Sequence, residues 1–202
     1  MGKLELSHRK NWQTECGQQA TNAERNLYRA FEGYFKGTKY HLHRKPKHLK
    51  ALYNKVQLSQ EELSQIYQPA IDLNRTKWGI TPDFAIENLE SKKILFGEIK
   101  RQDGWVENTT PKAGRGNVHE RFCKLFSPGL LKACREIGNI KDSTILPFWV
   151  VFEGDITRDP KRNREIAFWF DKYDKNYFMW RPQMTENSLI EHFDKYLKPY
   201  LE

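Results

Sequence analysis

Cysteine and long apolar runs are both scarce in this chain of 202 residues. The three cysteines, Cys16, Cys123 and Cys134, are an odd number and include no Cys-x-x-Cys pair. This pattern excludes a disulfide scaffold and a cysteine-rich zinc knuckle, and it indicates a reduced, cytoplasmic protein. The longest unbroken apolar run, Phe148 to Phe152, is far shorter than a membrane span, so we expect no membrane partner.

Acidic residues are in the minority. The chain has 26 Asp+Glu against 34 Lys+Arg, which gives a formal net charge of +8. A basic surplus points to an anionic partner, and nucleic acid is the first candidate. Aromatic residues make up 13% of the chain and are scattered through apolar runs, which favours core packing over platforms that stack single-stranded bases.

Repeats, low-complexity tracts and Gly/Ser linkers are absent, so we expect residues 1–202 to form a single domain. The predicted elements alternate between helices and strands, which indicates an α/β domain with a central mixed β-sheet flanked by helices. We expect helices at about residues 22–36, from Ser59 onward, at 117–126, 128–137 and 187–198, and strands at 84–86, 94–96, 144–153 and 166–170.

A polar hairpin at about residues 81–101 carries the first group of candidate functional residues. Pro82-Asp83 stands before its first strand, and Glu98-Ile99-Lys100 lies in its second. If the turn centres between residues 90 and 91, residues whose numbers sum to 181 stand opposite one another, which pairs Asp83 with Glu98. Glu98 and Lys100 project from one face, because alternate side chains of a strand do so.

Two carboxylates that close repel each other unless a cation lies between them. Their hard oxygen atoms suit Mg²⁺, and Lys100 beside them can orient or polarise an attacking water. Asp83, Glu98 and Lys100 are therefore candidates for phosphodiester hydrolysis. The alternative is a polar hairpin edge with an exposed ion pair. Glu90-Ser91-Lys92 has the same form but falls in the predicted turn.

A segment at about residues 112–126 carries the second group. Its glycines at 114 and 116 allow a close approach of the backbone to a ligand. Asn pairs with adenine and Arg with guanine in the major groove, and Asn117 and Arg121 lie one turn apart on one helix face. Glu120 can hold an arginine in position. The alternative is an ordinary helix start with surface charges.

The two groups together resemble a known family. Pro82-Asp83 with Glu98-Ile99-Lys100 resembles the catalytic signature of the PD-(D/E)XK nucleases. Residues 116–121, Gly-Asn-Val-His-Glu-Arg, resemble the recognition segment of the EcoRI-like group of type II restriction endonucleases. The resemblance covers about residues 80–125 and implies a restriction-endonuclease-like core.

The resemblance also implies an activity. It implies a Mg²⁺-dependent prokaryotic homodimer that cuts both strands of duplex DNA at a palindrome with central AATT, without a nucleotide cofactor. The implied site is CAATTG, and the products carry 5′-phosphates and four-nucleotide 5′ overhangs. Asp83 and Glu98 are the implied metal ligands, with Lys100 as the third catalytic residue.

The resemblance also implies which residues recognise the bases. Gly116, Asn117 and Arg121 are the implied readers of the central bases, and Glu120 orders their network. Arg115 is our candidate reader of the outer base pair.

Further basic residues are candidate phosphate contacts. Residues 41–55 contain no acid, and Arg44, Lys45 and Lys47 in this run, together with Lys112, are positioned in the sequence to contact DNA phosphates. The alternative is a solvated basic face.

Two other functions remain open from the residues. A structure-specific nuclease, such as a junction resolvase, would share Asp83, Glu98 and Lys100 but have no use for base readers. A non-catalytic DNA-binding module would carry the carboxylates incidentally.

Overall fold

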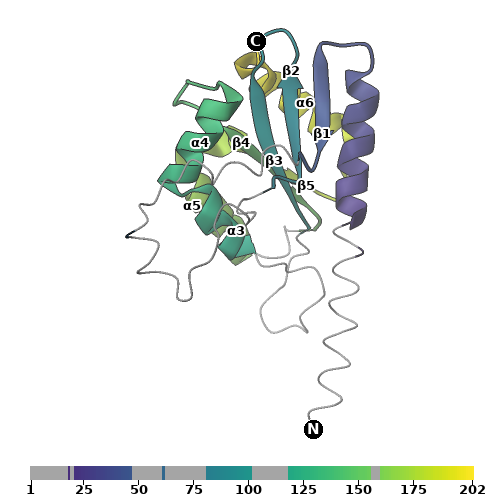
Figure 1. The fold of residues 1–202 in the computed structure, drawn as a ribbon. Coiled ribbons are helices and arrows are strands. Elements are labelled where there is room, and N and C mark those ends of the chain that lie inside the picture. Colours follow the sequence, from purple (N-terminus) through teal and green to yellow (C-terminus); the bar gives the residue numbers. More distant parts are fainter. Residues whose placement is uncertain (1–17, 19–20, 47–60, 62–80, 102–117, 156–159) are drawn as a thin grey trace.

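One mixed sheet forms the centre of the protein (Figure 1). A computed structural model describes residue 18, residues 21–46, residue 61 and residues 81–101, 118–155 and 160–202. The strand order is β1-β2-β3-β4-β5, with β1 to β3 antiparallel and β3 to β5 parallel. The strands are β1 (Tyr40–Arg44), β2 (Phe84–Asn88), β3 (Ile94–Arg101), β4 (Phe148–Glu153) and β5 (Tyr177–Trp180).

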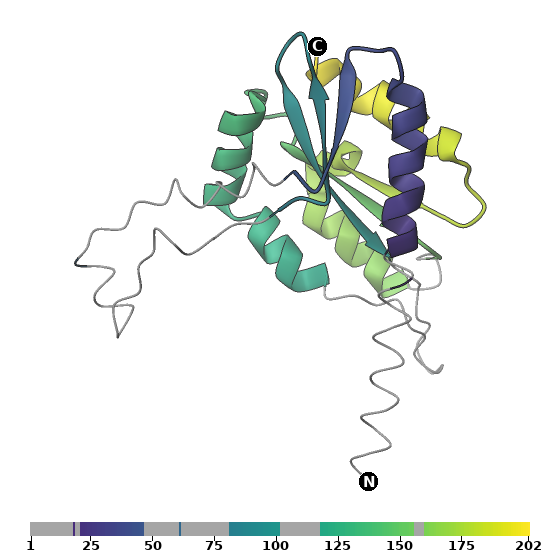
Figure 2. The same cartoon turned by 45° about the vertical axis from the view of Figure 1, so that its right-hand side comes forward.

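Helices cover both faces of this sheet (Figures 1 and 2). The helix of residues 21–35 and α6 (Glu186–Tyr196) pack against one face. The other face is covered by α3 (Val118–Leu125), α4 (Pro128–Gly138) and α5 (Pro160–Phe170). The expected α/β architecture with a mixed sheet flanked by helices is therefore confirmed. Within the described ranges, no helix is long and apolar enough to cross a membrane.

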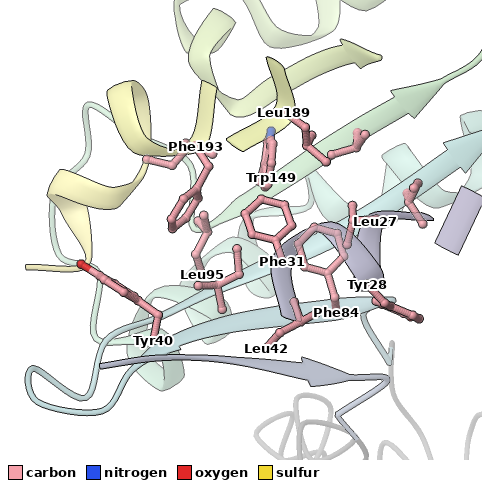
Figure 3. Close-up of a cluster of buried hydrophobic side chains, with 14 of the residues drawn as sticks. Leu27, Tyr28, Phe31, Tyr40, Leu42, Phe84, Leu95, Trp149, Leu189 and Phe193 are labelled. Atoms are coloured by element: carbon pink, nitrogen blue, oxygen red, sulfur yellow. The ribbon is translucent and has the colours of Figure 1, made fainter. Parts of the chain in front are cut away.

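Aromatic rings join the helix of residues 21–35 to the sheet (Figure 3). Phe31 is fully buried and meets Trp149 of β4 edge-on, with ring centroids 5.8 Å apart. It meets Phe193 of α6 in the same way at 5.5 Å. Edge-to-face pairs of this kind add to the stabilisation from burying their area. The first helix is thus fixed to the middle of the sheet.

The opposite face holds a second aromatic cluster. Phe122 of α3 stacks on Phe152 of β4 with centroids 5.7 Å apart and planes 17° apart. Phe170 of α5 packs against both rings. These contacts fix α3, the helix that follows the predicted recognition loop, against the strand next to β3.

The hairpin of β2 and β3 has the predicted register. Phe84 pairs with Gly97, Ala85 with Phe96 and Ile86 with Leu95, so the numbers of each pair sum to 181. The turn occupies residues 89–91, so Glu90 and Ser91 of the Glu90-Ser91-Lys92 sequence lie in the turn, as predicted, and Lys92 follows it directly. The buried Asn88 fixes this turn, since its side-chain oxygen accepts the amides of residues 90 and 91.

The prediction of a strand at residues 166–170 was wrong, because these residues end α5. Ile166 and Phe170 are fully buried, whereas Phe168 between them is 84% exposed. A strand would bury all three on one face, but a helix brings residues four apart together. The sequence also did not predict β1 or β5. The helix predicted from Ser59 lies outside the described residues.

Candidate active site

The hairpin register brings Asp83, Glu98 and Lys100 together. Asp83 immediately precedes β2, and the other two lie in β3. The Lys100 Nζ atom lies 2.8 Å from Glu98 Oε2 and 3.2 Å from Asp83 Oδ2. The ammonium group therefore bridges the two carboxylates, as expected if all three side chains share one face.

The accessibility of these side chains is graded. Glu98 is 1% exposed, whereas Asp83 is 17% and Lys100 is 23% exposed. A charge as deeply buried as Glu98 needs a partner, which Lys100 supplies. Asp83 and Lys100 are therefore the two members of the cluster that solvent reaches.

The electrostatics of Asp83 favour its ionised form. Burial alone would raise the pKa of this carboxyl, but four other effects together outweigh it. They are the Lys100 charge, a hydrogen bond with Glu98, the Ile99 amide, which donates to Asp83 Oδ2 at 3.0 Å, and the Lys100 ammonium, which donates to the same oxygen at 3.2 Å. The pKa of Asp83 is consequently lowered from its ordinary value.

The cluster lies on the sheet face that α3, α4 and α5 cover. Ala85 and Phe96 belong to the apolar cluster beneath these helices. Asp83 alternates with Ala85, and Glu98 and Lys100 alternate with Phe96, so all three project from that face. The site and the start of α3 are therefore on the same side of the molecule.

The main chain of Asp83 is also held. Its carbonyl oxygen accepts the Tyr28 hydroxyl at 2.8 Å and the Lys45 amide at 2.9 Å. Sequence reasoning did not identify Tyr28, because this bond joins residues 55 positions apart and ends on a main-chain atom. The available signal is a tyrosine within an amphipathic helix, since a buried hydroxyl must find a partner.

Two of the predicted phosphate contacts lie beside the site in ion pairs. Arg44 donates to both carboxylate oxygens of Glu32, at 2.7 and 2.5 Å, and Lys45 Nζ lies 2.8 Å from Glu24 Oε2. Both basic side chains are more than half exposed. Their contact with phosphate stays a prediction, and Lys47 and Lys112 lie outside the described residues.

The predicted base readers are only partly within the described chain. Glu120 and Arg121 lie in α3, so the predicted helix is confirmed over the residues that the structure describes there. Their side chains, and all of Arg115, Gly116 and Asn117, lie outside the described residues. Their roles stay predictions.

Comparison with known proteins gives the family. The family described as type II restriction enzyme MunI matches residues 1–202. The chain belongs to this MunI family. A type II restriction enzyme MunI from Mycoplasma sp is 63% identical over 202 residues, which is 100% of both chains. A crystal structure of MunI restriction endonuclease in complex with cognate DNA has a TM-score of 0.77 and 62% identity, and the match covers 95% of this chain and 98% of that one.

Membership of the MunI family confirms the resemblance first noted over residues 80–125 and extends it to the whole chain. The protein is thus a type II restriction enzyme, a site-specific deoxyribonuclease. The junction nuclease and the non-catalytic DNA-binding module are thereby set aside.

Proposed function

We propose that the protein is a Mg²⁺-dependent endonuclease that cuts both strands of duplex DNA at CAATTG. The products are expected to carry 5′-phosphates and four-nucleotide 5′ overhangs. The observation that carries the proposal is the contact of Lys100 with both carboxylates, Asp83 and Glu98, at one end of a buried hairpin.

The donor set suits Mg²⁺. Within the described ranges, no group of three or more His, Cys, Asp or Glu side chains is arranged to hold a metal. Two carboxylates are nevertheless sufficient, because Mg²⁺ keeps several waters and takes its remaining ligands from substrate phosphates. We assign Asp83 and Glu98 as the ligands. When bound there, Mg²⁺ supplies positive charge for the phosphoryl oxygens and acidifies a bound water.

The residues of the chain have separate roles in hydrolysis. Asp83 is held ionised by its neighbours, and Glu98 is buried beside it, so the pair presents a fixed negative site. Lys100 is the most accessible of the three, and its ammonium group orients the attacking water and stabilises negative charge on the phosphate by hydrogen bonding. The water oxygen bonds to phosphorus and releases a proton to solvent while the bond from phosphorus to the 3′ oxygen breaks. The 3′ oxygen takes up a proton from solvent, and the 5′-phosphate remains on the other product.

We assign base recognition to the segment that leads into α3. Gly116, Asn117 and Arg121 read the central AATT, Glu120 orders them, and Arg115 reads the outer pair. Support comes from the 62% identical MunI endonuclease, which was crystallised with its cognate DNA. Placing α3 on the same sheet face as the carboxylates is consistent with one surface that both reads and cuts DNA.

We propose that two copies act together in the cytoplasm of a prokaryotic cell. A palindromic site presents two equivalent half-sites, and a two-fold symmetric dimer matches them with one active site for each strand. The basic surplus of +8 supplies affinity for duplex DNA without regard to sequence.

Digestion of plasmid DNA tests the proposal. A plasmid with CAATTG sites is incubated with protein, with and without Mg²⁺, and the fragment ends are sequenced. We expect discrete fragments with identical 5′ overhangs only when Mg²⁺ is present, and a matched plasmid with GAATTC in place of each site stays uncut. Cutting at a different sequence would contradict the base assignment, and cutting without any divalent metal would contradict the metal assignment.

A further inference from the structure

Asp83 is held by hydrogen bonds from a helix and from both strands that flank β2. The Asp83 carbonyl oxygen accepts two hydrogen bonds, from the Tyr28 hydroxyl at 2.8 Å and from the Lys45 amide at 2.9 Å. Its carboxylate accepts a bond from the Ile99 amide at 3.0 Å. These bonds come from a helix, from the end of β1 and from β3, so three elements fix one residue.

Tyr28 is itself firmly placed. Its side chain is 7% exposed and belongs to the aromatic core of the first helix (Figure 3). The Arg44 guanidinium lies over its ring at 4.9 Å and is held in turn by Glu32. Burial, followed by the charges of Glu24 and Asp83, raises the pKa of the Tyr28 hydroxyl far above its ordinary value. The hydroxyl therefore stays a hydrogen-bond donor at working pH.

The second donor is held under backbone strain. Lys45 has a φ of +42°, a left-handed conformation that is uncommon for a residue other than glycine. Its amide points to Asp83 O while its Nζ atom pairs with Glu24, four residues before Tyr28. Strain of this kind persists where surrounding contacts enforce it, often beside functional groups.

We propose that Tyr28 is a positioning residue that sets the metal affinity of the site through the main chain of Asp83. The inference rests on the assignment of Asp83 as a metal ligand in the proposed function. A carboxylate ligand binds well only if its own backbone is held in place, and supporting hydrogen bonds commonly change metal affinity. Tyr28 acts through Asp83, because its hydroxyl binds the carbonyl oxygen of that residue and fixes its position.

The test compares two tyrosines of the same helix. Tyr28→Phe removes the hydroxyl that holds Asp83 and keeps the ring. Tyr34→Phe is the matched control, because the Tyr34 hydroxyl donates instead to Asp194 of α6 at 2.5 Å. Mn²⁺, which suits carboxylate sites as Mg²⁺ does, is titrated into each full-length protein without DNA, and free ion is measured by electron paramagnetic resonance.

We expect Tyr28→Phe to weaken Mn²⁺ binding by about threefold to tenfold, the effect of losing one neutral hydrogen bond. The Mg²⁺ concentration for half-maximal cleavage should rise by a similar factor, while metal-free DNA binding stays unchanged. Tyr34→Phe should leave all three quantities at their wild-type values. Thermal melting is recorded for both variants, and titrations are made at a temperature where each is folded.

Asp83→Ala separates the failure of this inference from that of the proposed function. If Asp83→Ala loses Mn²⁺ binding but Tyr28→Phe matches wild type, the positioning role is wrong and the metal site stands. An equal loss of Mn²⁺ binding in Tyr28→Phe and Tyr34→Phe would also overturn the positioning role, because it would reflect general loosening of the helix. If Asp83→Ala binds Mn²⁺ as wild type does, the metal assignment fails, and the positioning role fails with it.

Discussion

Gly97 leaves no room for any side chain next to the proposed catalytic residues. It stands opposite Phe84 in the hairpin, and these two residues adjoin Glu98 and Asp83 respectively. A β-carbon on Gly97 would lie 2.1 Å from the Phe84 ring, which is buried and cannot move aside freely. The Gly that precedes Glu98 is therefore required by packing.

Gly97→Ala should lower the free energy of unfolding by about 1–3 kcal/mol, the usual cost of overpacking a core. Gly33→Ala is the control, because Gly33 lies in the first helix with no atom within 4 Å of an added β-carbon. That change should raise stability by about 0.5–1 kcal/mol. Urea denaturation measures both, and a Gly97→Ala protein as stable as wild type would contradict the packing argument.

Arg121→Lys tests base reading by a single side chain. Lysine keeps the charge but loses the planar, two-pronged donor set that pairs with a base edge. We expect specific cleavage to fall at least tenfold, since a good bidentate contact contributes about 1–3 kcal/mol. Binding to non-cognate DNA should change little. Equal losses in cleavage assays and non-cognate binding assays would instead mean that Arg121 contacts phosphate.

The place of a single residue was predictable where its residue number alone gives its partner, as it does in a hairpin of known turn. The opposition of Asp83 and Glu98 followed from hairpin register alone, and the observed pairs obey it. Tyr28 followed no such rule, because its partner is a main-chain atom brought near by tertiary packing.

The closing helix α6 makes stability depend on pH. His192 stacks on Trp149 with planes 10° apart, and its Nε2 donates to the Lys175 carbonyl at 2.9 Å. Burial is the largest effect on this imidazole and lowers its pKa from the ordinary 6.5. The unfolded chain therefore binds a proton more readily than the folded one below that pH, and stability falls as the pH drops from 6.5 toward the lowered value.

His192→Phe should remove this dependence and keep a stacked ring. Between pH 7.5 and 5.5 the wild type should lose more stability than the variant, by at most about 1.4 kcal/mol per pH unit for one proton. Chemical denaturation at each pH gives the free energy of unfolding, and hence its slope against pH, for the wild type and for the variant. Parallel slopes would show that His192 does not titrate in this range.

Helices and strands were predicted well where a local start or turn signal marks them, and poorly where tertiary contacts decide. The hairpin was predicted from two apolar runs on either side of a polar stretch, and α4 from the Ser127-Pro128 start; both are confirmed. The segment of β1 was interpreted as part of a basic run. Its only apolar residues are the buried Tyr40 and Leu42, and the polar residues between and after them drew the interpretation toward a charged surface. Residues 166–170 were misassigned because an apolar run this short does not separate helix from strand by itself.

The larger aromatic core and the proposed active site lie on opposite faces of the central sheet. The face under the first helix and α6 carries the larger aromatic core, and the opposite face carries the carboxylate cluster beside α3. The net charge of +8 attracts DNA, but Asp83 and Glu98 place local negative charge at the proposed site. A divalent metal bound between the two carboxylates would offset this repulsion, so the proposed activity depends on the carboxylate pair.

Asp83→Ala tests that claim most directly. The variant and wild type are compared for cleavage of a CAATTG duplex across a range of Mg²⁺ concentrations, and for binding to the same duplex without metal. Glu87→Ala is the control, because Glu87 lies in β2 and its carboxylate pairs with His43 at 2.7 Å.

We predict that Asp83→Ala abolishes cleavage at every Mg²⁺ concentration and leaves the melting temperature near that of wild type. Its metal-free binding should hold or tighten, because one negative charge facing the scissile phosphate is removed. Glu87→Ala should cleave normally. Full cleavage by Asp83→Ala would contradict the assignment of this carboxylate pair as the active site.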